Sequence, residues 1–137
     1  MKRLLILFAI LLIISSFIWL YVFHKPKADY KTVAADYTIY AEQLYKEYSS
    51  KAGQQYTGKI LAVSGTATGI ESNDSIFTVV FVFNEGMFGD EGIRCVFLPE
   101  YNNELKKINF PAHVNLKGFC AGYNETDIII EHCSFVE

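Results

Sequence analysis

The chain has 137 residues, enough for one ordinary domain and a short appendage. It carries 12 basic and 15 acidic residues, and 51% of its residues are apolar. Four of the basic residues lie within the first 27 positions, which leaves 8 basic against 15 acidic residues, a balance of −7, for the rest of the chain. An acidic domain repels phosphate backbones, so the composition disfavours nucleic acid as a partner.

A run of 20 uncharged and mostly apolar residues from Leu4 to Phe23 predicts a membrane-spanning helix. A helix of that length reaches about 30 Å, the thickness of the hydrocarbon core of a bilayer. The run ends in aromatic residues, which fit the membrane interface better than the small-residue site of a signal peptidase. We therefore expect an uncleaved anchor over residues 1–24, with a cleaved signal peptide as the alternative.

The short N-terminal tail and the three cysteines of the domain suit an exported domain and set the expected orientation. Basic residues on the two sides of the apolar run nearly balance, so they do not decide it. We predict a single-pass protein of the cell inner membrane with a cytoplasmic N-terminus and a periplasmic, extracytoplasmic domain. Residues 25–35 are predicted to form a polar linker, in which Pro26 stops the helix, and residues 36–137 to form the domain.

Apolar residues at three- and four-residue steps predict an amphipathic helix over about residues 38–52. Asp36 or Thr38 is expected to cap its start, and Gly53 is expected to end it. The stripe is rich in tyrosine, and we interpret it as a packing face rather than as a ligand groove.

After Gly53 the pattern changes to that of strands separated by polar turns. Five strands are predicted at about residues 59–70, 75–83, 93–98, 112–122 and 127–136, with a short helix or turn at 100–108. This β-β-β-α-β-β order, in a mainly β domain, is that of the OB-fold, a five-stranded Greek-key barrel. Gly65 lies within the long first strand, where it is expected to permit a sharp bend. A small β-sandwich with the same strands is the alternative.

Several short motifs resemble those of a known family. They are Leu44-Tyr45-Lys46-Glu47-Tyr48, Tyr56-x-Gly58-Lys59-Ile60-x-x-Val63-x-Gly65-x-x-x-x-Ile70, Lys117-Gly118-x-Cys120 and His132-Cys133. Over about residues 36–137 the chain resembles the tRNA-anti-like proteins, which are bacterial OB-fold proteins that are usually exported or membrane-attached. The resemblance implies an OB-fold and an envelope location, and it brings no catalytic residues with it.

The three cysteines allow more than one pairing. Cys120 and Cys133 lie on the last two predicted strands, on either side of the turn, and we expect a disulfide between them in an oxidising compartment. Such a bridge would close a loop of about a dozen residues and contribute roughly 2–4 kcal/mol. Cys95–Cys133 is the competing pair, and three buried free thiols are the remaining alternative.

The sequence predicts no metal site, no cofactor and no catalytic residue. His132 and Cys133 are neighbours in a strand and would point to opposite faces, so they do not converge on one metal ion. The loop 84–92 matches neither a calcium-binding nor a phosphate-binding loop. We interpret it as a solvated hairpin whose tip residues, Met87 and Phe88, could touch a partner. No nucleophile–base pair is visible, so we do not expect an enzyme.

OB domains bind ligands on the face of their second and third strands and on the adjoining loops. On that pattern the candidate ligand-binding residues are Phe77, Phe81, Phe83, Arg94, Lys117, Phe119 and Tyr123, with core packing as the alternative for the phenylalanines. The favoured function is a non-enzymatic, membrane-anchored binding or interaction module of unidentified ligand. A nucleic-acid-binding OB domain and an unrecognised hydrolase are the alternatives. The expected partners are the membrane and a protein of the envelope.

Overall fold

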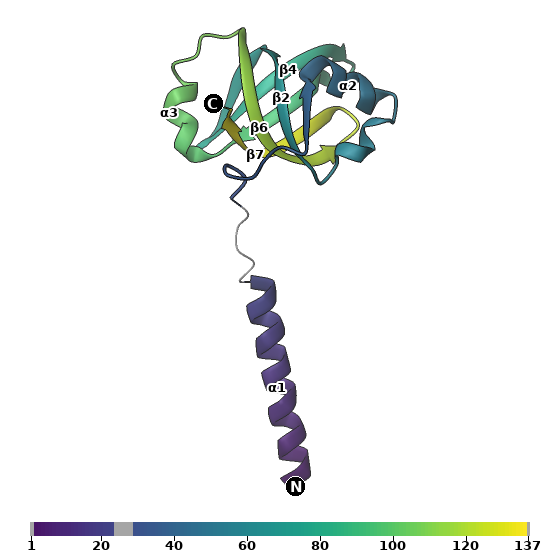
Figure 1. Ribbon diagram of the computed structural model, residues 1–137, viewed down its shortest axis with the longest axis vertical. Coiled ribbons are helices and arrows are strands. Elements are labelled where there is room, and N and C mark those ends of the chain that lie inside the picture. The colour runs from purple at the N-terminus through teal and green to yellow at the C-terminus, as the bar shows by residue number, and fades with distance from the viewer. Residues whose placement is uncertain (1, 24–28, 137) are drawn as a thin grey trace.

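The computed structural model describes residues 2–23 and 29–136, and the side chains of residues 10–21 and 29–136. Helix α1 (Lys2–Phe23) stands apart from a β-rich domain (Figure 1). Its side chains from Ile10 to Tyr21 are exposed. Among the described residues, no helix is both long enough and apolar enough to cross a membrane. The predicted anchor at residues 1–24 lies partly outside the described side chains, and so do residues 25–28 of the predicted linker.

The domain opens with a strand where the sequence predicts the first turn of a helix. Strand β1 (Tyr37–Tyr40) pairs in parallel with β2 (Ile60–Ala67). The Asp36 carboxylate accepts a hydrogen bond from the backbone N–H of Ile60 at 2.8 Å. The sequence predicts that Asp36 caps a helix. In the structure Asp36 instead links the start of β1 to β2. Pairing with an edge strand satisfies the backbone groups of these residues, and their β-branched and aromatic side chains suit a strand.

Helix α2 (Ala41–Ser49) is shorter than the predicted helix but keeps its predicted role. It begins after Tyr40 without a side-chain cap and ends at Ser49, with Ser50 as its C-cap residue. Leu44 and Tyr48 on its apolar stripe are buried, as expected for a packing face. Gly53 does not end α2 but starts the short 3₁₀ helix η1 (Gly53–Tyr56), four residues after Ser49.

Seven strand segments form one sheet in the order β1-β2-β6-β7-β5-β4-β3. The remaining segments are β3 (Gly69–Asn73), β4 (Ile76–Gly86), β5 (Gly89–Phe97), β6 (Ala112–Tyr123) and β7 (Asp127–Phe135), with η2 (Pro99–Tyr101) and α3 (Asn102–Leu105) between β5 and β6. The β5–β7 pair is parallel, and β7 is antiparallel to β6. The fold is thus mixed α/β with a seven-stranded sheet. The sheet has two more strands than the five predicted, because β1 is an additional strand and the predicted first strand is divided into β2 and β3.

The predicted first strand is divided at Thr68 into β2 and β3, and this division closes the sheet. β2 pairs with β6, whereas β3 pairs with β4, so one bent strand joins both margins of the sheet into a barrel. Thr68 fastens the bend: its N–H and its hydroxyl both donate to the Val80 carbonyl, at 2.8 and 3.0 Å. Its Oγ1 also accepts the N–H of Val82 at 2.8 Å. The bend therefore lies at Thr68 and not at Gly65, where the sequence predicts it.

Gly65 instead allows α2 to approach the barrel wall. A Cβ atom at this position would lie 2.9 Å from the Cβ of Ala41, the first residue of α2. A separation under 3.0 Å is closer than side chains tolerate, so the glycine permits the contact between the helix and the strand.

The barrel interior is a packed apolar core. Phe81, Ile93 and Ile130 are fully buried within it. Leu44 of α2 and Leu105 of α3 are fully buried as well, and the two helices lie at opposite ends of the strand assembly (Figure 1). Side chains fill a barrel of so few strands, and helices cover both of its ends. A ligand must therefore bind on the outer surface.

We expect Gly92→Ala to lower the free energy of unfolding by about 3 kcal/mol. Gly92 lies on β5, and a Cβ there would come within 1.8 Å of the backbone oxygen of Phe81 on β4, so both strands would have to shift. Gly69→Ala is the matched control, because no atom lies within 4 Å of its added Cβ, and it should change the stability by less than about 1 kcal/mol. Urea unfolding followed by circular dichroism measures both variants. Equal losses in the two would contradict the close-packing argument.

Candidate functional site

Arg94 is the central polar residue on the outer face of β3, β4, β5 and β7. Along β5 the side chains of Ile93, Cys95 and Phe97 are buried, so Arg94 points outward between them. It lies opposite Val80 of β4 and Ile129 of β7, which places it in the middle of the face on which OB domains bind ligands.

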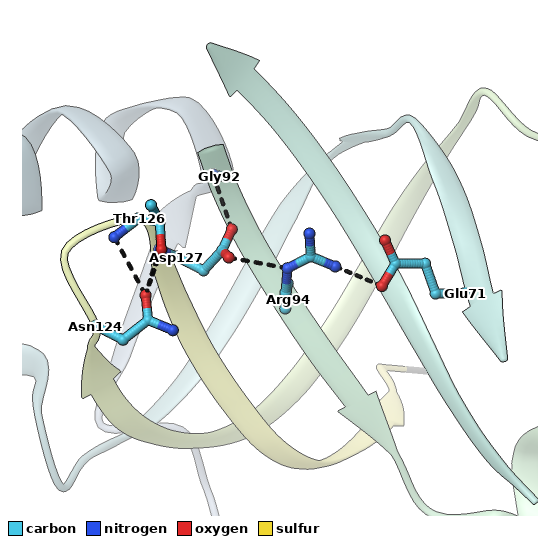
Figure 2. A network of polar contacts seen from close by, with 6 residues as sticks. All are labelled: Glu71, Gly92, Arg94, Asn124, Thr126 and Asp127. Atoms are coloured by element: carbon cyan, nitrogen blue, oxygen red, sulfur yellow. Dashed lines mark hydrogen bonds and ion pairs between the residues drawn. The ribbon is translucent and has the colours of Figure 1, made fainter. Parts of the chain in front are cut away.

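The guanidinium of Arg94 is held by two carboxylates from neighbouring strands. Its Nε donates to Asp127 Oδ2 at 2.9 Å, and its Nη1 donates to Glu71 Oε2. Figure 2 shows the three side chains in a row across the face. The hydrogen bond with Glu71, supported by the one with Asp127, raises the pKa of Arg94, against the opposing effect of partial burial. The only arginine of this face is therefore neutralised from both sides.

Asp127 connects this ion pair to the turn between β6 and β7. It is 8% exposed and accepts a second hydrogen bond, from the N–H of Gly92, at 3.1 Å. Asn124 braces the turn: its Oδ1 accepts the N–H of Thr126 at 3.2 Å and that of Asp127 at 2.7 Å (Figure 2). The carboxylate is thus held in place before any ligand arrives.

A cavity of about 810 Å³ lies beside this turn, between α2, η1 and β6. Tyr48, Thr57, Tyr123 and Glu125 are among the residues that line it. The rings of Tyr48 and Tyr123 lie 5.8 Å apart. Burial raises the pKa of both tyrosines, so both keep their hydroxyl protons at physiological pH. Lys51 lines the cavity as well, so its hydroxyl groups, aromatic faces and two opposite charges suit polar ligand groups of either sign.

Tyr45 and Glu91 extend the polar surface from α2 to the β4–β5 hairpin. The Tyr45 hydroxyl donates to Glu91 Oε2 at 3.1 Å, and Asn84 Nδ2 donates to the same oxygen at 2.9 Å. Burial and the hydrogen bond to Glu91 raise the pKa of Tyr45, so it acts as a donor. The tyrosines of α2 thus have a place on the site surface as well as in packing.

The three phenylalanines predicted to bind ligand belong to the packing of the barrel. Phe81 is fully buried, and Phe77 and Phe83 are partly buried against the core. Phe83 stacks on Tyr45 of α2, with ring centroids 5.1 Å apart. All three lie at alternate positions of β4, on its inward-facing row, so the alternative of core packing accounts for their position.

Lys117 and Phe119 on β6 are covered by the segment 29–36. The Lys117 ammonium donates to the carbonyl oxygens of Lys31 at 2.9 Å and Val33 at 2.7 Å. Tyr30 lies against Phe119 with ring centroids 5.6 Å apart, and stacks on His132 of β7 at 4.9 Å. These contacts engage Lys117 and Phe119 within the chain itself.

The seven predicted ligand-binding residues therefore do not converge on one site. Arg94 and Tyr123 alone lie on the surface described above, near the turn at 124–126. Sequence reasoning missed Glu71, Asp127 and Tyr45 as members of this surface. The alternation of side chains along each strand would have placed Asp127 and Glu71 on outward-facing positions. Their closeness to Arg94, however, depends on the pairing of strands that are distant in the sequence.

The predicted disulfide between Cys120 and Cys133 is not formed, and all three cysteines are buried free thiols. The three-residue connection 124–126 sets a register in which Cys120 lies opposite Ile130, whereas Cys133 lies opposite Phe97 of β5. Burial raises the pKa of Cys120, and burial together with a hydrogen bond to Cys95 raises that of Cys133. The three buried thiols pack as small apolar groups.

Potential metal ligands do not gather on the domain surface. Within residues 10–21 and 29–136, no group of three His, Cys, Asp or Glu side chains is placed to hold a metal ion.

Comparisons with known proteins agree with the barrel architecture. Residues 1–134 match the family described as tRNA_anti-like. A lipoprotein of Klebsiella pneumoniae, inferred to bind nucleic acid, superimposes with a TM-score of 0.53 at 17% identity, over 73% of this chain and 91% of that one. At this level of identity the likeness concerns the fold alone.

Two larger proteins are more distantly similar. One is a protein of Leishmania major inferred to be an aspartyl-tRNA synthetase (TM-score 0.48, 10% identity, 81% of this chain). The other is the aspartyl-tRNA synthetase of Entamoeba histolytica (TM-score 0.47, 14% identity, 83% of this chain). The match spans 22% and 24% of those chains, so it concerns a minor part of each. No curated protein matches the sequence.

We expect Asp127→Ala to lower the free energy of unfolding by about 2 kcal/mol, because Arg94 and the N–H of Gly92 would both lose a partner in a largely buried place. Glu71→Ala is the matched control. Its side chain is 59% exposed, so water can replace it and the loss should be about 0.5 kcal/mol. Thermal and urea unfolding measure both, and a larger loss for Glu71→Ala would refute this ranking.

Proposed function

The chain belongs to the tRNA_anti-like family, and on that basis we propose that it is a non-enzymatic binding module of the cell envelope. In this proposal the OB-fold domain binds a protein partner with its outer face, at Arg94, Tyr45 and Tyr123. The domain lies outside the cytoplasm, and the N-terminal apolar segment attaches it to the inner membrane.

The charge of the face is the observation that carries the choice of ligand class. β3, β4, β5 and β7 contain one Lys or Arg residue, Arg94, against six acidic residues. Both Glu71 and Asp127 already engage that arginine. A phosphate backbone approaching this face would meet carboxylates and no free cation on these strands. The face would therefore repel the phosphates, most strongly at low ionic strength, where salt screens the charges least.

Nucleic-acid binding is the second candidate. It is favoured by the inferred function of the Klebsiella lipoprotein, which shares the fold. Tyr45 and Tyr123 also provide aromatic groups of the type on which unpaired bases stack. Stacking alone is worth about 1–3 kcal/mol per base, which does not offset a repulsive field along several phosphates.

Filter binding of the full chain in detergent micelles to single-stranded RNA at low salt tests the choice. We expect no retention at micromolar protein, because the face is acidic. If RNA is retained, two variants show whether the proposed face is responsible. Glu71→Gln would remove one of the two negative charges beside Arg94 and strengthen binding, and Arg94→Ala would abolish it. Retention that follows this pattern would replace the protein partner with nucleic acid.

Envelope attachment rests on the sequence of the N-terminal segment and on the described part of α1. From Ile10 to Tyr21 the side chains are uncharged and exposed, which is unfavourable in water over so long a stretch. The Klebsiella relative is a lipoprotein, a class held at membranes by a lipid, whereas this chain has no cysteine in its first 94 residues. We therefore assign attachment to the apolar segment itself, with the N-terminus in the cytoplasm. The buried free thiols add nothing to this assignment.

Carbonate extraction of cell membranes checks the attachment. We expect the full chain to remain in the membrane pellet and a chain lacking residues 1–28 to be released, because about 20 apolar residues insert stably in lipid. Protease added to spheroplasts should digest the domain without lysis if it faces outward. A full chain that is released by carbonate, or a domain digested only after lysis, would contradict the proposed location.

A further inference from the structure

The tip of the β4–β5 hairpin exposes two large apolar side chains. Met87 is 95% exposed and Phe88 is 93% exposed, the two highest values among the large apolar residues of the domain. They form a two-residue connection between Gly86 and Gly89, which are paired across the strands. Polar residues such as Asn-Gly usually occupy such a connection. The unusual backbone angle falls on Gly89, with a φ of +126°, so the turn itself does not require methionine and phenylalanine.

Two carboxylates face each other immediately behind this tip. Glu85 and Asp90 are directly opposite in the antiparallel pair, and both are exposed. Within the described part of the chain neither forms an ion pair. Like charges in opposing positions destabilise a hairpin by a fraction of a kcal/mol. The isolated domain therefore bears both an exposed apolar pair and an unrelieved repulsion at the same place.

The base of the hairpin is braced, so the tip is presented on a defined support. Glu91 accepts hydrogen bonds from Asn84 and from Tyr45 of α2, and Phe83 stacks on the Tyr45 ring. A side chain on Gly86 would collide with Glu91, whose carboxylate lies over the glycine. The hairpin is thus held against α2 through Phe83 and Glu91, and Met87 and Phe88 project beyond this support.

We propose that the hairpin tip is a docking element that inserts Met87 and Phe88 into an apolar pocket of a protein partner, and that lysine or arginine side chains around this pocket meet Glu85 and Asp90. The inference deepens the proposed function, on which it rests, by giving the chemistry of the partner surface. Methionine and aromatic side chains are enriched at interface centres, and charges at the rim steer the encounter.

Charge complementarity selects a protein rather than a lipid surface as the occupant. An apolar tip alone would also suit insertion at a membrane interface. Anionic lipid headgroups, however, repel a pair of carboxylates held two residues behind the inserted side chains. A basic protein surface relieves the repulsion between Glu85 and Asp90 and buries the apolar pair in one event.

Photo-crosslinking of the full chain in the membrane of intact cells tests this inference. A benzophenone amino acid replaces Phe88 in one variant and Ile76 in a control, since Ile76 is also exposed but lies at the other end of β4. We expect a protein adduct from position 88 and none from position 76. Mass spectrometry of the adduct should place the crosslink in an apolar segment flanked by lysine or arginine.

Glu85→Lys separates binding from folding. It converts the like-charged pair with Asp90 into an opposite pair, so the thermal midpoint should stay equal or rise. The position-88 adduct should fall at least tenfold, because the new lysine repels the basic rim. An adduct with lipid only, no adduct, an adduct on an acidic surface, or one that Glu85→Lys leaves unchanged would overturn the docking element. RNA binding through Arg94 would instead refute the proposed ligand class, so the two failures are distinguishable.

Discussion

One bent strand determines the architecture, because β2 and β3 pair with different margins of the same sheet. Thr68, which lies between β2 and β3, holds the bend through three hydrogen bonds to β4. Closure separates an inside from an outside. The inside is filled by apolar rows from each strand, and α2 and α3 cover the two ends (Figure 1). Every surface on which the protein can act follows from this closure.

The Arg94 network shows how one set of contacts can serve both stability and recognition. Asp127 links β5 to the turn between β6 and β7, and Glu71 extends the link to β3. The ion pairs that join these strands also neutralise the positive charge of Arg94. An OB barrel whose central arginine were unpaired would attract phosphate, whereas here the same residue leaves a net negative surface. The sign of the field is therefore set by internal pairing and not by residue type alone.

Two regions of the outer surface have different roles. The segment 29–36 covers β6 on one side, where Lys117 and Tyr30 hold it against the strands. The opposite region, with the tyrosines of the cavity and the β4–β5 hairpin, remains open. Because the chain itself engages Lys117, the only lysine of β6, the strands left for partners, β3, β4, β5 and β7, carry charged side chains that are mainly acidic. A protein partner with a basic surface, as proposed for the hairpin tip, would complement this charge.

The sequence by itself determined the approximate positions of the five predicted strands, the buried stripe of α2, the helix before the fourth predicted strand and the acidity of the domain. These features depend on local periodicity and on composition, which report whether a side chain is buried but not what it touches. Only the tertiary structure decided that residues 37–40 form a strand, because their partner is β2, more than twenty residues away. It also decided the register of β6 and β7, which depends on a turn held by Asn124 and separates Cys120 from Cys133. Arg94 stood out in the sequence, but its two carboxylate partners come from strands distant along the chain, so the site could be located only once the barrel had brought them together.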